Sequence, residues 1–337
     1  MGARIINYDW LRAIGLTLIV LAHVQAPWLI TQFRCFDVPL MIFVSALCYK
    51  PSNNPYMKYV IMRFARLYIP TLIFLMLFFL IVYIAKTIGI VIPYTKNQII
   101  GSFLLCEKPS IGYVWIIRAF IIISLIAPFL YRLAVNSKNL LIFGSTCLGA
   151  FILAELLSYA SAFITNPLVQ YINSEILIYI LSYGIIFNIG VLVKNLSIHR
   201  IINLSTTCLI ILSLSISYLA YNNCWIPLSP NYKYPPHSYF IIYGIICSLI
   251  LYAIPFDRIK SKKVQDLIAY ISTNSMWIYL WHIPFVVLGN SVKNIGDYWV
   301  FKWLFCYIFA IIITFIQAKV VKMLERGHSS AIIKYLK

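Results

Sequence analysis

The sequence predicts an all-α fold: a polytopic membrane helical bundle of about ten transmembrane helices, with both termini in the cytoplasm. Composition is the first reason, because 62% of the 337 residues are hydrophobic and only 11% are charged, whereas a soluble domain carries roughly 25% charged residues. The second reason is that apolar residues form runs of about 20, the length of a helix that crosses a bilayer. The third is the uneven distribution of basic residues, which sets the orientation.

Ten apolar runs follow one another along the chain. The second is short, because its 14 residues extend only about 21 Å as a helix, and we expect it to begin below the outer surface of the membrane. No repeat, low-complexity tract or soluble segment interrupts the series, so we expect a single membrane domain over residues 1–337. The predicted spans are 11–30, 36–49, 67–92, 111–131, 139–158, 174–193, 201–221, 237–256, 267–290 and 298–325.

Lys and Arg residues gather on one side of these spans. Of the 27, 18 lie in the connections that share a side with the two termini, and five lie in the opposite connections. Because an excess of Lys and Arg marks the cytoplasmic side, both termini are expected there. The same bias, facing anionic lipid, accounts for the net charge of +18. We therefore expect membrane lipid, and not nucleic acid, as the partner of this charge.

Two ionisable residues lie within the first predicted span. Arg12 is near its start, and His23 follows eleven residues later, which is about three helical turns. The spacing predicts both side chains on one face of one helix, about 16 Å apart along its axis. An ionisable side chain inside a membrane is costly, so each is a candidate functional residue.

Five landmarks along the chain carry a resemblance to a known family. They are Asn7-Tyr8-Asp9-Trp10-Leu11-Arg12 with His23, Phe36-Asp37-Val38-Pro39-Leu40-Met41-Ile42-Phe43-Val44-Ser45, Arg63-Phe64-Ala65-Arg66 before Tyr68-Ile69-Pro70, Trp115, and Ile278-Tyr279-Leu280-Trp281-His282-Ile283-Pro284. In this order, and over essentially the whole chain, they resemble the integral-membrane acyltransferase 3 family. Two departures, Ser45-Ala46-Leu47 in place of Ser-Gly-Phe and Asp37 in place of a histidine found in one subgroup, leave the substrate open.

The resemblance implies a multi-pass acyltransferase of the bacterial inner (cytoplasmic) membrane. Such an enzyme moves an acyl group, usually acetyl from cytoplasmic acetyl-coenzyme A, to a hydroxyl of a surface glycan or its lipid-linked saccharide precursor. The sugar, the hydroxyl position, the acyl chain and the oligomeric state are not given by the sequence. No cysteine or histidine spacing favours a metal site.

The chemistry of O-acyl transfer points to His23 and Asp37 as catalytic residues. A base must take the hydroxyl proton, or a nucleophile must carry the acyl group, and histidine does either near neutral pH. We expect the carboxylate of Asp37, at the start of the short second span, to orient the imidazole. The alternatives are a buried histidine bonded to a carbonyl and a surface aspartate at a helix N-terminus.

Three arginines are candidates for binding the coenzyme. Arg12 lies near the cytoplasmic face, and Arg63 and Arg66 are three residues apart, which makes them neighbours on a helix. Guanidinium groups suit the phosphates of acetyl-coenzyme A. The alternative for all three is the ordinary anchoring of basic residues on the cytoplasmic side.

Candidate acceptor-binding residues lie in the outer halves of two spans. Aromatic faces and cationic donors suit a glycan hydroxyl pattern or a lipid-linked phosphate, although aromatic belts at the membrane surface explain many tryptophans and tyrosines. The candidates are Trp115, Arg118, Tyr279, Trp281 and His282.

Two other classes of protein compete with a membrane acyltransferase. A non-catalytic relative that exports polysaccharide would keep the spans and the outer aromatic residues but would not need Arg12 and His23. A proton-coupled transporter of small solutes would be expected to show two related halves with broken helices, and the sequence shows no such symmetry.

Overall fold

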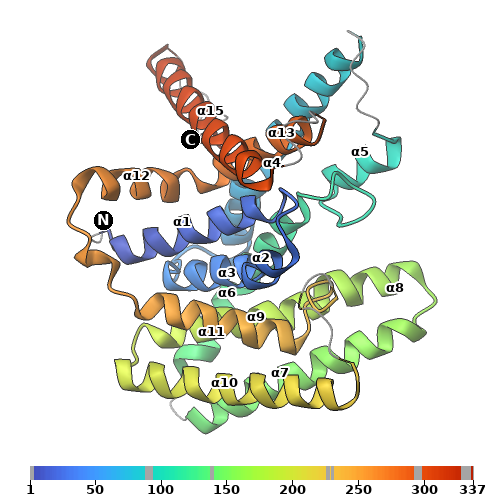
Figure 1. Ribbon diagram of the computed structural model, residues 1–337, viewed down its shortest axis with the longest axis vertical. Coiled ribbons are helices and arrows are strands. Elements are labelled where there is room, and N and C mark those ends of the chain that lie inside the picture. Colours follow the sequence, from blue (N-terminus) through green and yellow to red (C-terminus); the bar gives the residue numbers. More distant parts are fainter. Residues whose placement is uncertain are drawn as a thin grey trace. The chain divides into compact units, whose positions relative to one another are not determined.

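The computed structural model describes residues 4–87, 94–136, 140–224, 228, 231–291, 298–327 and 335–336. These residues form helices joined by turns, and none of those described lies in a strand (Figure 1). The prediction of an all-α fold is confirmed. The α-helices are α1 (Ile6–Leu21), α2 (Trp28–Phe33), α3 (Asp37–Leu47), α4 (Tyr56–Thr87), α5 (Lys96–Phe103), α6 (Trp115–Asn136), α7 (Leu140–Ala160), α8 (Pro167–Ile172), α9 (Ile178–Val193), α10 (Ile198–Tyr221), α11 (Ser238–Ala253), α12 (Lys262–Thr273), α13 (Ser275–Ser291) and α15 (Trp299–Gly327).

The chain folds into two compact units whose segments alternate along the sequence. Unit 1 consists of residues 1–22, 27–53 and 126–269, and unit 2 of residues 23–26, 54–125 and 270–337. The boundaries fall inside α6 and α12, so two helices contribute to both units. The expectation of one domain over residues 1–337 stays a prediction.

Unit 1 is built around the short helix α3. Nine of its 11 residues are buried, and it packs against α1, α9 and α11. Pro39 is accepted in its first turn because the first N–H groups of a helix have no partner within it. This extensive burial explains why the segment is apolar apart from Asp37 at its start and the exposed Ser45.

Glycines let the neighbouring helices approach α3 closely. A Cβ on Gly190 of α9 would lie 2.9 Å from the Phe43 carbonyl oxygen, and one on Gly244 of α11 would lie 2.5 Å from Cβ of Pro39. Because helices in a membrane associate through van der Waals packing, such small residues at their contacts are expected. A side chain at either position would push a helix away from α3.

The two ends of α3 collect different connections of unit 1. At its C-terminal end, Lys194 donates a 3.2 Å hydrogen bond to the carbonyl of Tyr49. At its N-terminal end, Lys233 lies 2.8 Å from Asp37, and Ser182 donates to the carbonyl of Pro236. Connections predicted to be cytoplasmic thus meet at one end, and connections predicted to be outside meet at the other.

Unit 2 contains α4, α5, the first part of α6, α13 and α15. Helix α13 packs against both α4 and α15, and α5 packs against α4 (Figure 1). The side chain of Trp281 on α13 shows how these contacts are made. Its indole N–H donates to Oε1 of Gln317 on α15 at 2.5 Å, and its ring meets Phe74 of α4 edge to face at 5.8 Å.

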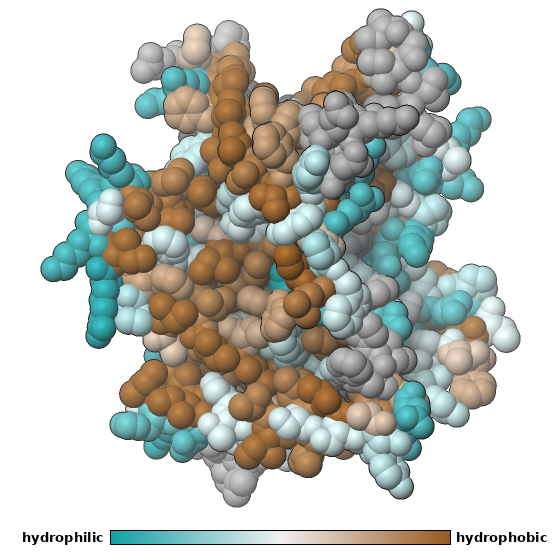
Figure 2. All heavy atoms as spheres, viewed as in Figure 1, coloured by the Kyte–Doolittle hydropathy of each residue, from teal (hydrophilic) through white to brown (hydrophobic). Residues whose placement is uncertain are grey.

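Eight stretches of the described chain are long and apolar enough to cross a membrane. Only 11% of the stretch in α7 and 17% of that in α10 is buried within the protein. Figure 2 shows hydrophobic residues gathered over α10 and α11 and along α15. Apolar surface of this extent requires a lipid environment. The chain is therefore a multi-pass membrane protein, as the sequence predicts.

Three predicted spans differ from the helices that form. The span predicted at 67–92 lies in α4, which begins earlier, at Tyr56, and its residues 88–92 lie outside the described residues. The span predicted at 11–30 is wrong at both ends, because α1 covers Ile6–Leu21 and α2 begins at Trp28. Pro27 precedes α2 and cannot continue a helix from the turn before it. The span predicted at 267–290 is divided between α12 and α13. At about 1.5 Å per residue, α1 and α13 reach only about 24 and 25 Å.

Candidate active site: a histidine pair and a buried charge cluster

His23 lies in the turn that follows α1, not on the helix itself. Arg12 and His23 therefore do not share one helical face, and this prediction is wrong. The chain turns sharply after the histidine, with Gln25 at φ 57° and Pro27 before α2. The orientation of the imidazole is therefore set by the turn and not by the helical repeat of α1.

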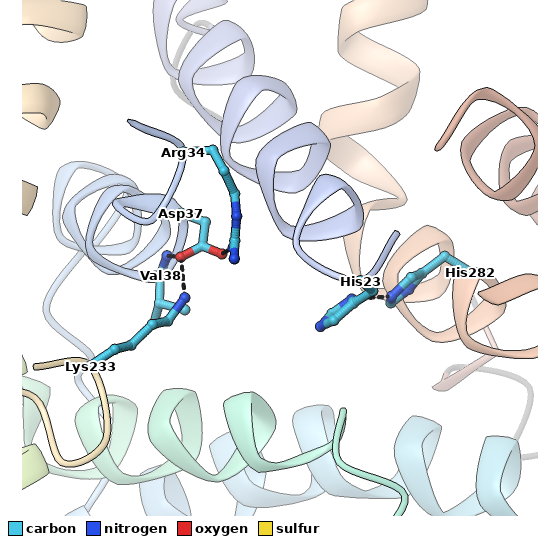
Figure 3. A network of polar contacts seen from close by, with 6 residues as sticks. All are labelled: His23, Arg34, Asp37, Val38, Lys233 and His282. Carbon is cyan, nitrogen blue, oxygen red and sulfur yellow. Dashed lines mark hydrogen bonds and ion pairs between the residues drawn. The ribbon is translucent and has the colours of Figure 1, made fainter. Parts of the chain in front are cut away.

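The partner of His23 is His282 of α13. Nδ1 of His23 lies 2.8 Å from Nε2 of His282, and the two rings meet edge to edge, with their centres 5.0 Å apart and their planes at 19° (Figure 3). Both residues belong to unit 2. The structure thus joins two predicted site residues that are 259 positions apart in the chain.

His282 is held firmly within unit 2. Its side chain is fully buried, with 0% exposure, and its Nδ1 hydrogen-bonds the backbone carbonyl of Tyr279 one turn earlier on α13. The hydroxyl of Tyr279 in turn donates to the carbonyl of Tyr113. The role that the sequence predicts for His282, binding the acceptor, stays a prediction.

Tyr113 completes an aromatic wall beside the pair. Its ring meets His23 edge to face at 4.7 Å and His282 at 6.4 Å. It lies in the connection before α6, where burial raises the pKa of its hydroxyl. The phenol is therefore neutral at physiological pH, so it adds no charge beside the histidines.

A separate cluster in unit 1 surrounds Asp37. Its Oδ2 receives Nη1 of Arg34 at 2.8 Å, and its Oδ1 receives Nζ of Lys233 at 2.8 Å (Figure 3). The backbone N–H of Val38 also donates to Oδ1 at 2.9 Å. The three charged side chains are buried, with 7%, 2% and 2% of Arg34, Asp37 and Lys233 exposed.

Lys233 reaches this cluster from the connection before α11. Burial lowers the pKa of its ammonium group, while the nearby charge of Asp37 acts in the opposite direction. The sequence gives Lys233 and Arg34 only as basic residues of outer connections. The one signal in the sequence is that acidic residues are scarce, with nine Asp and Glu against 27 Lys and Arg. A buried aspartate is therefore a candidate partner for the basic residues of the outer connections.

Asp37 and His23 each have a partner within their own unit. The carboxylate is paired with two cations in unit 1, and the imidazole is paired with His282 in unit 2. The expected role of Asp37 in orienting His23 stays a prediction. In unit 2, the residue that hydrogen-bonds Nδ1 of His23 is a second histidine, His282.

The three candidate coenzyme residues are divided between the units. Arg12 of α1, in unit 1, donates from Nη2 to the Cys48 thiol at 3.3 Å. Arg63 and Arg66 lie in unit 2 on α4, where the guanidinium of Arg63 stands 5.3 Å from the ring centre of Tyr59. Their role in binding a coenzyme stays a prediction.

The remaining candidates contribute to the packing of unit 2. Trp115 and Arg118 lie in the first turn of α6, with 5% and 7% of each residue exposed. Trp281 bridges α13 to α15 as described above. These positions make the three residues part of a rigid framework, and their contact with an acceptor stays a prediction.

Together these features define a helical, multi-pass membrane protein with a paired histidine suited to proton transfer. The family model for the acyltransferase domain Acyl_transf_3 matches residues 5–318, nearly the whole chain. The chain belongs to the acyltransferase 3 family and is a membrane acyltransferase. No curated protein and no solved structure gave a match.

Proposed function

We propose that this protein transfers an acetyl group from cytoplasmic acetyl-coenzyme A to a hydroxyl of an extracytoplasmic glycan or lipid-linked sugar, in the bacterial inner membrane. The family supports acyl transfer through a membrane protein. The observation that carries the catalytic part is the pairing of His23 with His282 at 2.8 Å. A histidine held in one orientation is suited to general base catalysis near neutral pH.

In the proposed reaction, the acceptor hydroxyl oxygen attacks the thioester carbonyl carbon of the donor. His23 takes the hydroxyl proton as the new C–O bond forms, and the C–S bond then breaks. Coenzyme A leaves as a thiolate and recovers a proton from the imidazolium. His23 can instead attack the thioester itself and carry the acetyl group before it passes to the hydroxyl.

Each unit carries cations on its predicted cytoplasmic side, and these are proposed to bind the donor. Arg12 and Lys194 lie at the C-terminal end of α3, where unit 1 collects the connections predicted to be cytoplasmic. Arg63 and Arg66 lie near the predicted cytoplasmic start of α4 in unit 2. Charge-assisted hydrogen bonds to the coenzyme phosphates are the contribution proposed for the three arginines.

The proposed acceptor end lies around the connection that precedes α6. His23 contacts Tyr113 of that connection, and Trp115 and Arg118 follow at the start of α6. Tyr279 and Trp281 lie within one turn of His282 on α13. Aromatic side chains and a guanidinium in this region are the groups proposed to recognise a saccharide that carries hydroxyl or phosphate groups.

The experiment is direct. Full-length protein in lipid nanodiscs is incubated with acetyl-coenzyme A labelled in the acetyl group, with and without candidate glycans, and label in the glycan is measured. We expect label transfer, and slow hydrolysis of acetyl-coenzyme A when water is the only acceptor. If neither occurs, and the protein instead moves a glycan or a small solute across a vesicle membrane, the acetyltransferase proposal is wrong.

A further inference from the structure

We propose that His282 is a positioning residue that fixes His23 in one tautomer, with the proton on Nδ1 and the lone pair on Nε2. The nitrogen that acts on the substrate is then Nε2 of His23. The catalytic consequence rests on the proposed function, but the tautomer itself is a property of the folded protein. The sequence places His282 among residues that touch the acceptor, so this is a different role.

The chain of hydrogen bonds determines the direction of each donor. A backbone carbonyl only accepts, so Nδ1 of His282, which bonds the carbonyl of Tyr279, must carry a hydrogen. In a neutral imidazole the other nitrogen is then an acceptor. Nε2 of His282 therefore accepts from Nδ1 of His23, which must carry the hydrogen of that 2.8 Å bond.

The opposite direction would need a charged His282. To donate from Nε2 while Nδ1 donates to the Tyr279 carbonyl, the ring would have to hold both protons. His282 is fully buried among aromatic side chains, with 0% exposure. Placing an isolated cation there carries a large desolvation cost. The neutral arrangement is the one that the surroundings favour.

This arrangement suits a base that works inside a membrane. When Nε2 of His23 takes a proton, the ring becomes an imidazolium that still donates from Nδ1 to His282. In a Ser-His-Asp triad an aspartate fills the accepting position and supplies a negative charge. Here the neutral ring of His282 accepts the same hydrogen bond, so no permanently charged side chain has to be buried next to His23.

Burial also argues against direct contact of His282 with a substrate. With 0% exposure, its ring has no surface to offer, and both of its nitrogens are engaged, one by Tyr279 and one by His23. Its influence on the reaction must therefore pass through His23. His282 is therefore a positioning residue and not one that touches the substrate.

Two substitutions separate this role from mere packing. In His282→Gln the amide oxygen can occupy the place of Nε2 and still accept from His23, whereas in His282→Asn the shorter chain places its amide group near the former Nδ1, out of reach of His23. We expect His282→Asn to lower kcat by about 10²–10⁴-fold, as other losses of tautomer control do, with KM for both substrates nearly unchanged. We expect His282→Gln to restore at least about tenfold of that loss.

A second measurement does not depend on activity. The chain has only five histidines, so ¹⁵N NMR of histidine-labelled protein in nanodiscs can assign His23 by comparison with His23→Ala. We expect wild-type His23 to be protonated on Nδ1, and His282→Asn to shift it to protonation on Nε2. His199→Ala, on the exposed face of α10, serves as the control for histidine replacement.

The outcomes are distinct. Wild-type His23 protonated on Nε2, or equal activity of the Gln and Asn variants, would overturn the positioning role of His282. If the wild-type protein transfers no acetyl group but shows the Nδ1 tautomer, the proposed function fails while the inference about His282 stands.

Discussion

The buried charge cluster of unit 1 and the histidine pair of unit 2 use polar side chains in opposite ways. In the cluster, both oxygens of Asp37 are occupied by cations, Arg34 on one and Lys233 on the other. In the pair, Nδ1 of His23 is occupied by a neutral ring, and no formal charge is held in place. The first arrangement is already compensated, whereas the second gains a charge only during proton transfer.

This difference separates stability from chemistry. A buried carboxylate with two cationic partners holds a connection against the start of α3, and its loss leaves uncompensated charge. In the pair only His23 is proposed to change its protonation, and histidine is the side chain suited to do so near neutral pH. We therefore expect substitutions in the pair to affect turnover, and substitutions in the cluster to affect folding.

The largest effect is expected for His23→Ala. Loss of the base should reduce acetyl transfer by about 10³-fold or more, while the midpoint of thermal unfolding in detergent should change little, since a small apolar residue is readily accommodated. Transfer of labelled acetyl is measured beside the control His199→Ala. Activity of His23→Ala within tenfold of wild type would contradict its role as base or acyl carrier.

The next effect is expected in the charge cluster, for Asp37→Asn. Two buried cations would lose their counter-charge, which typically costs about 3–5 kcal/mol of stability. The free energy of unfolding in detergent is measured against Asp257→Asn, an exposed aspartate of a connection predicted to be cytoplasmic. A stability equal to wild type would show that the two cations are compensated elsewhere.

The same substitution also tests the predicted coupling of Asp37 with His23. If the carboxylate orients the imidazole, the double variant His23→Ala, Asp37→Asn should turn over no more slowly than His23→Ala alone, because residues that act as a unit are not additive. Turnover is corrected for the folded fraction. A further loss in the double variant would confine Asp37 to the structural role that its ion pairs describe.

The sequence predicts the helices better than their ends. Apolar runs identify the long helices because burial in lipid demands about 20 apolar residues. The end of α1 at Leu21 is hidden, because apolar residues continue beyond Pro27 into α2. Hydropathy records composition, whereas a turn is set by backbone geometry.

The partners of the site residues are harder to predict than the residues themselves. Arg12, His23 and Asp37 stand out because ionisable side chains are costly in apolar segments. Their contacts depend on tertiary packing: Lys233 is 196 positions from Asp37, and His282 is 259 positions from His23. A single sequence carries no signal for pairs at such separations, which is why the contact between His23 and His282 is not predicted.

A smaller effect is expected at the three arginines that are proposed to bind the coenzyme. Arg12→Ala, or Arg63→Ala with Arg66→Ala, should weaken acetyl-coenzyme A binding by about 10-fold or more, through the loss of charge-assisted hydrogen bonds. Titration calorimetry measures the affinity, with the exposed Arg200→Ala as the control. Unchanged affinity would assign these arginines to membrane orientation alone.

The smallest effect is expected for Lys233→Met, and it gives the sharpest test of the charge cluster. Removal of Lys233 leaves Arg34 and Asp37 as a neutral pair, whereas removal of Asp37 leaves two cations. The lowered pKa of Lys233 means that its charged form is less stable in the folded protein than in water. Methionine keeps the apolar stem beside Phe240 and removes that charge, so we expect the free energy of unfolding to change by less than about 1 kcal/mol.

The pH dependence of stability gives a second test of Lys233→Met. The pKa of Lys233 is lower in the folded protein than in the unfolded chain. Between these two pKa values the unfolded chain binds more protons than the folded protein, so the stability of the wild type should rise with pH. The rise should end at about pH 10.4, the ordinary lysine pKa. Lys233→Met should lack this rise, and the exposed Lys96→Met should retain it. A loss of several kcal/mol in Lys233→Met at neutral pH would instead mean that Asp37 needs both cations. Arg34, Asp37 and Lys233 would then stabilise the fold as a set of three, and not as one ion pair beside an extra cation.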